Sequence, residues 1–518
     1  MISNVGLLGD CRATCQEVSR RGPRRAMGRG HTRVLSLAGR PATMVIVNPN
    51  REIIRNIMVS VVIVAVTLAA VWVAISFGKL AFIGVIGAVG LLVAAYVGVR
   101  HPMWLFYALA VIMAGLQFGR IPGVSLPMYL PLAFGAVVAS YFHPRLARSM
   151  HPLEMAWIAL IVTSGITMAV NANGFVDYSL YIRWLIPSMV LFALVQLPRE
   201  NLKRFGQIFT VVAAANGLFG MYMVAFDQNN TALRIFQPFG YLPEAITPIF
   251  AQGGDGVTGT IRLGGTWVNA NGAGLNLALA VGLSVLLFAG WQRVALVLIT
   301  TAALLLTLSR ASIFSVVAGV ILVLMFGAMR ARDRAATIGL GVVVAAGALL
   351  APAVRDRLTS AFAGRDVGSI ARADALRVFP SQMAHNWQFG WGWGRPEFID
   401  PAYSYVFNLP SNAPLITLYR GGFLPFLAFV AVMAISIALS YRSLRSNSLP
   451  LATYGGIVIG LTVVQFNLDH NVSDVPQNVL LWSIMLAFVL YAEDVRKDAA
   501  TSEGKGLKPH SAPELLPR

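Results

Sequence analysis

The chain has 518 residues, of which 57% are hydrophobic and only 12% are charged, and its formal net charge is +18. A soluble protein of this length could not bury so much apolar surface in one core, so the composition excludes an ordinary soluble enzyme and indicates a membrane protein. In a membrane protein the positive charge is explained by tails and loops that face anionic lipid, so it does not indicate nucleic-acid binding.

An arginine-rich arm, residues 1–56, precedes the first apolar segment and is predicted to be cytoplasmic. Met27 and Met44 are alternative starts, so the arm is either genuine or the product of an over-extended start. It lacks the short apolar core and small-residue site of a cleavable signal peptide. Because Cys11 and Cys15 both lie in this arm, no disulfide is expected in the outer loops.

Apolar segments of roughly 20 residues, the length that crosses a hydrocarbon layer, recur along most of the chain. We therefore predict an all-α fold, a polytopic transmembrane helical bundle of about 14 spans within residues 57–492. The predicted spans are 57–77, 80–99, 103–119, 126–142, 153–170, 181–197, 208–226, 271–289, 294–308, 310–329, 336–353, 422–440, 451–467 and 479–492. A polar tail, residues 493–518, follows and is predicted to be disordered and cytoplasmic.

The orientation is predicted from the Lys and Arg residues of the short loops, which remain on the cytoplasmic side. With the N-terminus inside, the short outer loops hold only Lys79, Arg120 and Arg310, whereas the inner loops hold many more. One missed span would invert every later loop, so this asymmetry favours an even number of spans with both termini in the cytoplasm. We predict a multi-pass protein of the bacterial cytoplasmic (inner) membrane with a periplasmic working face.

Two long outer segments, 227–270 and 355–412, interrupt the regular alternation of spans, and loops this long are usually functional. The second lies between spans 11 and 12 and carries both arginines and acidic residues, which favours a folded cap. Within it, Trp391 and Trp393 alternate with glycine, and indole faces suit stacking against sugar rings. The alternative interpretation is an aromatic belt at the membrane interface.

Two arginines lie at the outer ends of predicted spans. Arg183 is either a substrate-binding residue or an interfacial anchor beside Trp184. Arg310 lies in the short outer link between two adjacent spans, directly after Ser309. A Ser at the cap position and an Arg in the first helical turn present backbone N–H groups and a guanidinium together, a combination typical of an anion site.

No predicted span has an acidic residue in its middle. Glu154 lies at an inner edge of a span and Asp469 at an outer edge. Ion-coupled transporters normally place carboxylates near the midplane, so a transport function is disfavoured. His385 and His470 have no second histidine at ligand spacing, so the sequence predicts neither a metal site nor a cofactor.

Four segments resemble motifs of the O-antigen ligase and O-antigen polymerase superfamily of membrane glycosyltransferases. Residues 262–273 (RLGGTWVNANGA) and 306–312 (LTLSRAS) resemble its Gly-Thr-aromatic and Ser-Arg elements. Residues 386–394 (NWQFGWGWG) resemble its Gly-rich outer element, and residues 411–422 (SNAPLITLYRGG) resemble an element that opens the next span with His-Asn. The resemblance covers about residues 255–440. Ser411 replaces the histidine that the family often carries, so the role of that histidine is not transferred.

The resemblance implies a metal-independent glycosyltransferase acting outside the cytoplasmic membrane. It would transfer a glycan from an undecaprenyl-diphosphate-linked donor to an acceptor, which is a lipid-linked glycan or the lipid A core. Arg310 is the candidate that stabilises the diphosphate leaving group, and Asp469, His470 and His385 are candidate bases. The remaining candidates are assigned to substrate binding: Arg183, Arg262, Asn269, Asn271, Trp391, Trp393, Arg395 and Asn412.

Two other functions remain as alternatives. One is a transporter or flippase of lipid-linked oligosaccharide, which would need a cavity open to alternate sides of the membrane. The other is a glycosyltransferase that uses a polyprenyl monophosphate sugar; this class carries acidic residues in its first outer loop, where this chain has only Gly78 and Lys79. The sequence does not distinguish a polymerase from a ligase.

Overall fold

The structure is a computed structural model that describes residues 100–122, 126–142, 149–227, 229–241, 262–328, 330–350, 376–393, 412–468 and 475–504. It also describes the isolated positions 64, 90, 96–98 and 355. The chain divides into two compact units, residues 1–68 and 69–518, and the elements below all belong to the second. The two predicted spans at 57–77 and 80–99 lie almost entirely outside the described residues, as does most of the arm at 1–56.

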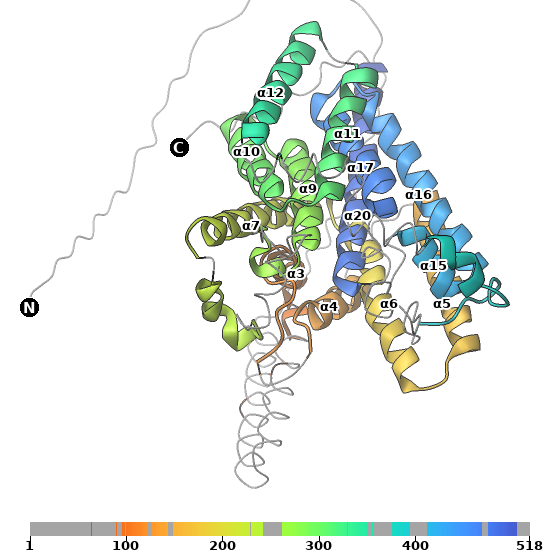
Figure 1. The fold of residues 1–518 in the computed structure, drawn as a ribbon. Helices are drawn as coiled ribbons and strands as arrows, with labels where there is room; N and C mark the ends of the chain where they lie inside the picture. Colours follow the sequence, from red (N-terminus) through yellow and green to blue (C-terminus); the bar gives the residue numbers. More distant parts are fainter. Residues whose placement is uncertain are drawn as a thin grey trace, which may run out of the picture. The chain divides into compact units, whose positions relative to one another are not determined.

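The described part of the second unit is helical, with one isolated β-bridge between Arg120 and Pro127 (Figure 1). Its α-helices are α3 (Pro102–Gly115), α4 (Tyr129–Phe142), α5 (Pro152–Asn171), α6 (Phe175–Val195), α7 (Arg199–Phe226), α9 (Ala270–Leu287), α10 (Gly290–Leu306), α11 (Arg310–Phe326), α12 (Ala331–Leu350), α15 (Ala413–Gly421), α16 (Phe423–Leu444), α17 (Leu449–Gly460), α18 (Phe466–Leu468) and α20 (Pro476–Gly504). Shorter elements are the 3₁₀ helices η1 (Thr231–Phe239) and η2 (Gly265–Trp267) and the π-helix η3 (Leu461–Gln465).

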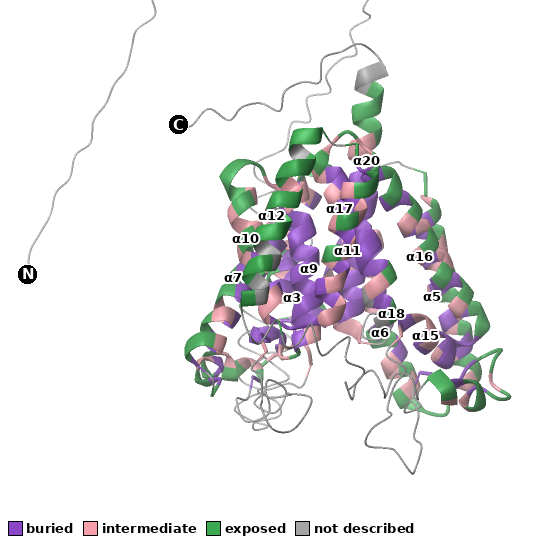
Figure 2. Ribbon diagram, turned by 45° about the horizontal axis from the view of Figure 1, so that its top comes forward, coloured by how far each residue is buried: buried purple, intermediate pink, exposed green. Residues whose placement is uncertain are grey.

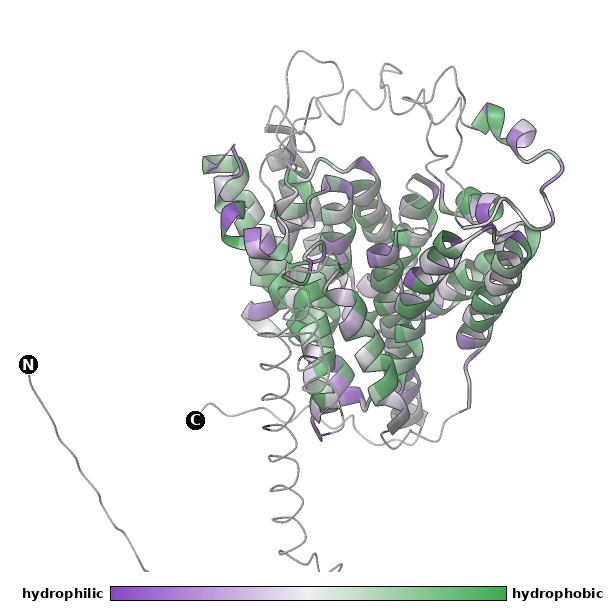
Figure 3. Cartoon of the chain, turned by 90° about the horizontal axis from the view of Figure 1, so that it is seen from below, coloured by the Kyte–Doolittle hydropathy of each residue, from purple (hydrophilic) through white to green (hydrophobic). Residues whose placement is uncertain are grey.

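Among the described residues, six helices are long and apolar enough to cross a membrane: α5, α6, α7, α9, α16 and α20. Shorter apolar helices cover the remaining predicted spans from residue 103 onwards. The all-helical membrane fold is therefore confirmed, whereas the predicted count of about fourteen spans is not. Figure 3 shows that hydrophobic residues occur along most of each helix, including surfaces that face outward.

Burial differs between the helices in a way that their composition explains. In α9 and α20, 83% of the apolar window is buried, so these two helices form the centre of the packing (Figure 2). Helix α9 is apolar or small on all sides, which is typical of a helix surrounded by other helices. Large apolar side chains of the outer helices, such as Trp104, Phe134 and Trp291, are exposed and are suited to contact lipid.

Helices α11 and α17 pack closely and run antiparallel. Gly319 of α11 lies against Gly456 of α17, and Ser315 lies against Gly460, one turn further along. Small residues at such positions allow two helix backbones to approach closely within a membrane. The antiparallel packing places Arg310, at the start of α11, near the end of α17, and Phe326 near the start of α17.

Candidate functional site

A three-residue link joins α10 to α11 and determines the position of Arg310. The Thr307 hydroxyl donates to the Leu304 carbonyl at 2.6 Å and accepts from the Ser309 N–H at 3.2 Å. Leu308 has φ +51°, a conformation that non-glycine residues rarely adopt. Ser309 is the N-cap residue and Arg310 the first residue of α11, as predicted. Arg310 therefore belongs to the first helical turn, whose backbone N–H groups have no partner within the helix.

A second arginine is fixed against the same link. Arg262 donates from Nε to the Thr307 carbonyl at 2.9 Å and from Nη2 to Asn271 Oδ1 at 2.9 Å. The neighbouring Leu263 N–H donates to the Leu306 carbonyl at 2.9 Å, so backbone and side chain both hold this segment in place. The guanidinium group of Arg262 thus lies against the link that directly precedes Arg310.

The N-termini of α9 and α11 lie side by side. Asn269 caps α9 by accepting from the Asn271 N–H at 2.8 Å. A methyl group placed on Gly274 of α9 would be 2.6 Å from Ser312 Oγ and 2.8 Å from Ser309 Cβ, both near the start of α11. Helix N-termini carry partial positive charge and exposed N–H groups, so this arrangement favours an anionic ligand.

The segment before α9 is fixed by the backbone of α3 and a side chain of α7. Asn216 of α7 donates to the Ala114 carbonyl at 3.1 Å, and its Oδ1 accepts from the Thr266 N–H at 3.4 Å. The Thr266 hydroxyl donates to the Gly115 carbonyl. Val268, which follows η2, has φ +60°, unusual for a β-branched residue. Such strain is maintained only where the surrounding structure determines the backbone, as these hydrogen bonds do here.

Three buried amides lie beneath this region, and the sequence analysis did not identify them. Asn276 Nδ2 donates to Gln117 Oε1 at 3.1 Å, and Gln117 Nε2 donates to Asn478 Oδ1 at 3.4 Å. They connect α9 to the segment after α3 and to the start of α20. Buried amides are costly unless they are paired, so this chain of hydrogen bonds restricts how the three segments pack. The signal in the sequence was a polar residue within or beside an apolar stretch at each of the three positions.

The Trp/Gly segment, residues 386–393, lies along the end of α15. The Trp391 N–H donates to the Tyr419 carbonyl at 2.7 Å, and the Gly392 N–H donates to the Arg420 carbonyl at 3.0 Å. A methyl group on Gly390 (φ +63°) would lie 2.6 Å from the Gly422 nitrogen. Glycine at this position therefore allows the segment to pack against the α15–α16 junction. This packing explains the presence of glycine without a bound glycan.

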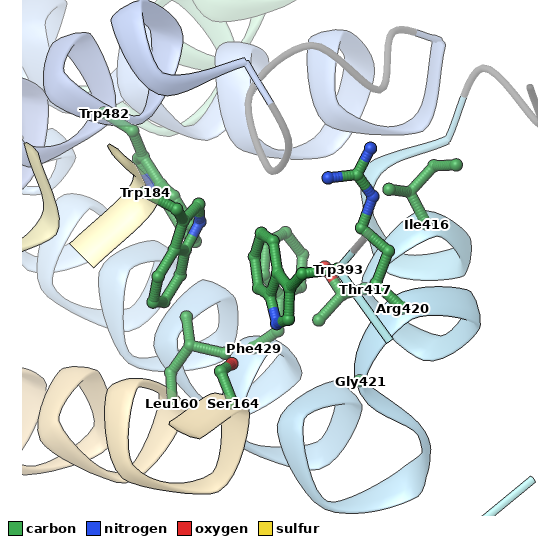
Figure 4. Close-up of a pocket in the computed structure, with 10 residues that line it drawn as sticks. All are labelled: Leu160, Ser164, Trp184, Trp393, Ile416, Thr417, Arg420, Gly421, Phe429 and Trp482. Carbon is green, nitrogen blue, oxygen red and sulfur yellow. The ribbon is translucent and has the colours of Figure 1, made fainter. Parts of the chain in front are cut away.

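Trp393 is only 6% exposed and packs among protein side chains (Figure 4). Its ring lies 4.9 Å from that of Trp184 and 6.0 Å from that of Tyr181, measured between centroids. The Arg420 guanidinium carbon lies 5.5 Å from its centroid, within range of a cation–π interaction. The cavity that these residues line has a volume of about 10 Å³, enough for one water molecule.

Trp391 is also engaged with the protein, because its Nε1 donates to the Gln382 carbonyl at 2.9 Å. Trp387 is the most exposed tryptophan of the segment, with 44% of its surface accessible to solvent. Trp387 was not among the predicted site residues.

The structure brings together four predicted site residues, Arg262, Asn269, Asn271 and Arg310, at the starts of α9 and α11. Arg183 lies exposed on α6, within electrostatic range of the Tyr129 hydroxyl, and α6 packs mainly against α4, α5 and α20. His385 is exposed, with φ +74°, just before the Trp/Gly segment.

Asn412 is the N-cap residue of α15, accepting from the Leu415 N–H at 3.0 Å and donating to Asn467 Oδ1 at 3.2 Å. It therefore connects α15 to the segment that leads towards residues 469–474. The predicted residues Asp469, His470 and Arg395 lie outside the described residues. Within the described ranges, no group of three or more His, Cys, Asp or Glu side chains could hold a metal ion.

Comparison with known families agrees with the sequence motifs. Residues 294–417 match the family model described as O-Antigen ligase. The match contains the α10–α11 link with Arg310, the Trp/Gly segment and most of α15. A search among curated proteins found no match. The family match confirms the resemblance to the O-antigen ligase superfamily.

Proposed function

We infer, from its resemblance to the O-antigen ligase superfamily, that this membrane protein is a glycosyltransferase that acts on a polyprenyl-diphosphate-linked glycan. The observation that carries the proposal is the pair of guanidinium groups, Arg262 and Arg310, beside the adjacent N-termini of α9 and α11. A diphosphate carries several negative oxygens, and fixed guanidinium and N–H groups are the donors that proteins use to bind it.

In the proposed reaction an acceptor hydroxyl attacks the anomeric carbon of the donor glycan. The bond from that carbon to the diphosphate oxygen breaks, so negative charge increases on the leaving diphosphate while the hydroxyl loses its proton. Arg310 stabilises the leaving group, and Arg262, fixed by Thr307 and Asn271, holds the donor in place. Removing one such preorganised donor typically costs about 2.7–4 kcal/mol of barrier lowering.

The base that takes the proton is assigned by location alone. Asp469 and His470 follow the segment that Asn412 contacts through Asn467, and His385 precedes the Trp/Gly segment. Arg183 and Arg395 remain candidates for contacts with the glycan or the diphosphate. The guanidinium groups supply the positive charge for which other glycosyltransferases use a metal ion, so we propose that the reaction needs no metal.

The donor is proposed to be undecaprenyl-diphosphate-linked, and the acceptor to be a second lipid-linked glycan or the lipid A core. The reaction is placed on the periplasmic side of the bacterial inner membrane, with both termini in the cytoplasm. This placement rests on the distribution of Lys and Arg in the short loops.

The proposal is tested by reconstituting the full-length protein in liposomes with a synthetic undecaprenyl-diphosphate oligosaccharide and a chelator. Formation of a longer lipid-linked glycan with release of undecaprenyl diphosphate supports it. A ladder of products identifies a polymerase, and a single addition to lipid A core identifies a ligase. Movement of intact donor between leaflets without new glycosidic bonds would instead support a flippase and overturn the proposal.

A further inference from the structure

A cationic cavity lies at the other end of the bundle from Arg310. Its volume is about 530 Å³, and its lining includes Arg442 and Arg445 at the end of α16, Ser448 and Leu451 at the start of α17, and Arg496 of α20. Because α11 runs antiparallel to α17, the start of α17 and Arg310 are separated by about the length of α11, roughly 25 Å. The cavity is therefore distinct from the proposed glycosyltransferase site.

The charge of this cavity is strongly positive. Glu493 is 1% exposed and is bound by Arg496 through hydrogen bonds of 2.8 and 2.9 Å. Arg442 lies 3.8 Å and Lys497 3.7 Å from the same carboxylate. Four cations, counting Arg445, thus accompany one carboxylate, which leaves an excess of three positive charges. Asp498, further along α20, pairs instead with Arg199 of α7.

The free ends of these arginines are available to a ligand. Arg442 keeps 60% of its side chain exposed although it approaches Glu493. Arg445 is exposed, and within the described residues its side chain donates a long hydrogen bond, 3.4 Å, to the Tyr441 hydroxyl. The N-cap residue of α17, Ser448, also lines the cavity and makes no side-chain capping hydrogen bond within the described structure.

Exposed apolar side chains border the cavity. Tyr441 is 40% exposed and packs edge-to-face on Phe326, and Leu449 is exposed at the start of α17. Figure 2 shows that the neighbouring C-terminal part of α20 is exposed beyond the buried part of the bundle. Cations at helix ends next to exposed apolar surface match the chemistry of a lipid, in which a charged headgroup adjoins acyl chains.

We propose that this cavity binds the phosphodiester headgroup of an anionic phospholipid, with Arg442 and Arg445 as the principal contacts and Tyr441 and Phe326 against the acyl chains. A volume of about 530 Å³ lies within the range of small-molecule sites and accommodates a headgroup. Glu493 orients Arg496 and balances one positive charge, and each bound phosphodiester balances one more.

The test measures lipid binding by the purified full-length protein in neutral detergent, by native mass spectrometry and thermal unfolding. The probes are phosphatidylglycerol, phosphatidylcholine and inorganic phosphate. The variants are Arg445→Gln and Arg442→Gln, neither of which removes the bidentate partner of Glu493. The matched control is Arg332→Gln, an exposed arginine near the start of α12.

Phosphatidylglycerol should bind the wild type and raise its unfolding temperature, and each cavity variant should weaken binding about fivefold, the effect of one cation near an anionic lipid surface. The control should bind as the wild type does. Binding of phosphatidylglycerol that both cavity variants leave unchanged would overturn the proposal. Equal binding of phosphatidylcholine, or saturation by inorganic phosphate at the same concentration, would also overturn it. Glycan transfer is not part of the readout, so the outcome is independent of the proposed function.

Discussion

Arg262 donates a 2.9 Å hydrogen bond from Nη2 to Asn271 Oδ1, so a residue before α9 is fixed by a residue in its first turn. The same guanidinium donates from Nε to the carbonyl of Thr307, which joins the starts of α9 and α11. These two contacts fix the orientation of the guanidinium group, the kind of group that binds bidentate oxyanions.

The contact between Arg262 and Asn271 should therefore matter for the reaction. Asn271→Ala should reduce kcat/KM about tenfold, because Arg262 loses the partner that orients it. The double variant Arg262→Ala/Asn271→Ala should be no worse than Arg262→Ala alone. A hydrogen bond to a charged group contributes about 1.5–3 kcal/mol, which sets the expected coupling energy. Additive losses in the double-mutant cycle would show that the two residues act independently.

The close approach of α9 and α11 should be sensitive to one methyl group. Gly274→Ala would bring its Cβ to 2.6 Å from Ser312 Oγ, so the two helix starts must separate, at a cost of about 1–3 kcal/mol. Gly272→Ala is a matched control on the same helix, because a methyl group there meets nothing within 4 Å. Thermal unfolding in detergent should show a lower midpoint for Gly274→Ala and no decrease for Gly272→Ala. Equal midpoints would mean that the helices are not packed in this way.

The tryptophans of the Trp/Gly segment should separate into a structural and a binding group. Trp393→Ala removes a buried ring from the cluster with Trp184 and Arg420 and should lower stability by about 3–5 kcal/mol. Trp387→Ala removes an exposed ring and should leave stability nearly unchanged while raising KM for the donor glycan. Unfolding midpoints and KM values measured on both variants check this division; a reversed pattern would contradict it.

Asp227, which follows α7, should make stability depend on acid pH. Burial alone would raise the pKa of its carboxyl. The carboxyl accepts three hydrogen bonds, from the Ala232 N–H at 2.6 Å, the Thr231 hydroxyl at 2.7 Å and the Thr231 N–H at 2.9 Å. Together these hydrogen bonds outweigh burial and lower the pKa below the usual 3.8. The lowered pKa means that the stabilisation is complete above pH 3.8 and is lost as the pH falls through the folded-state value.

At neutral pH, Asp227→Asn should consequently unfold at a lower temperature than the wild type, by the equivalent of about 1 kcal/mol. The difference should shrink as the pH is lowered below 3.8. Thermal unfolding of both proteins across this pH range provides the measurement. A difference that stays constant with pH would show that ionisation of Asp227 is not involved.

Local features of the fold and the site were predictable from the sequence. The start of α11 at Arg310 follows from Ser309 and the apolar run after it, and the structure begins the helix at that residue. The contact of Arg262 with Thr307 was not predictable. It joins two residues far apart in the chain, and a hydrogen bond from a side chain to a backbone carbonyl has no signature in the order of residue types. Whether Trp393 faces a ligand or the protein likewise depends on α6 and α15, which the local Trp/Gly pattern does not specify.

The buried amides show the same limit. Gln117, Asn276 and Asn478 lie within or beside apolar stretches, where a polar residue is compatible with a helix end, a lipid boundary or a buried contact. Only the packing of α9 against the segment after α3 and the start of α20 makes them partners.

The central claim is that the Arg310 guanidinium holds the diphosphate as the sugar departs, and Arg310→Lys tests it most directly. Lysine keeps the charge but loses the bidentate fork. In liposomes with the synthetic undecaprenyl-diphosphate donor, kcat of Arg310→Lys should fall at least a hundredfold, the usual cost of losing one such donor, while Arg332→Lys, near the start of α12, should keep wild-type turnover. Wild-type turnover by Arg310→Lys would contradict the account.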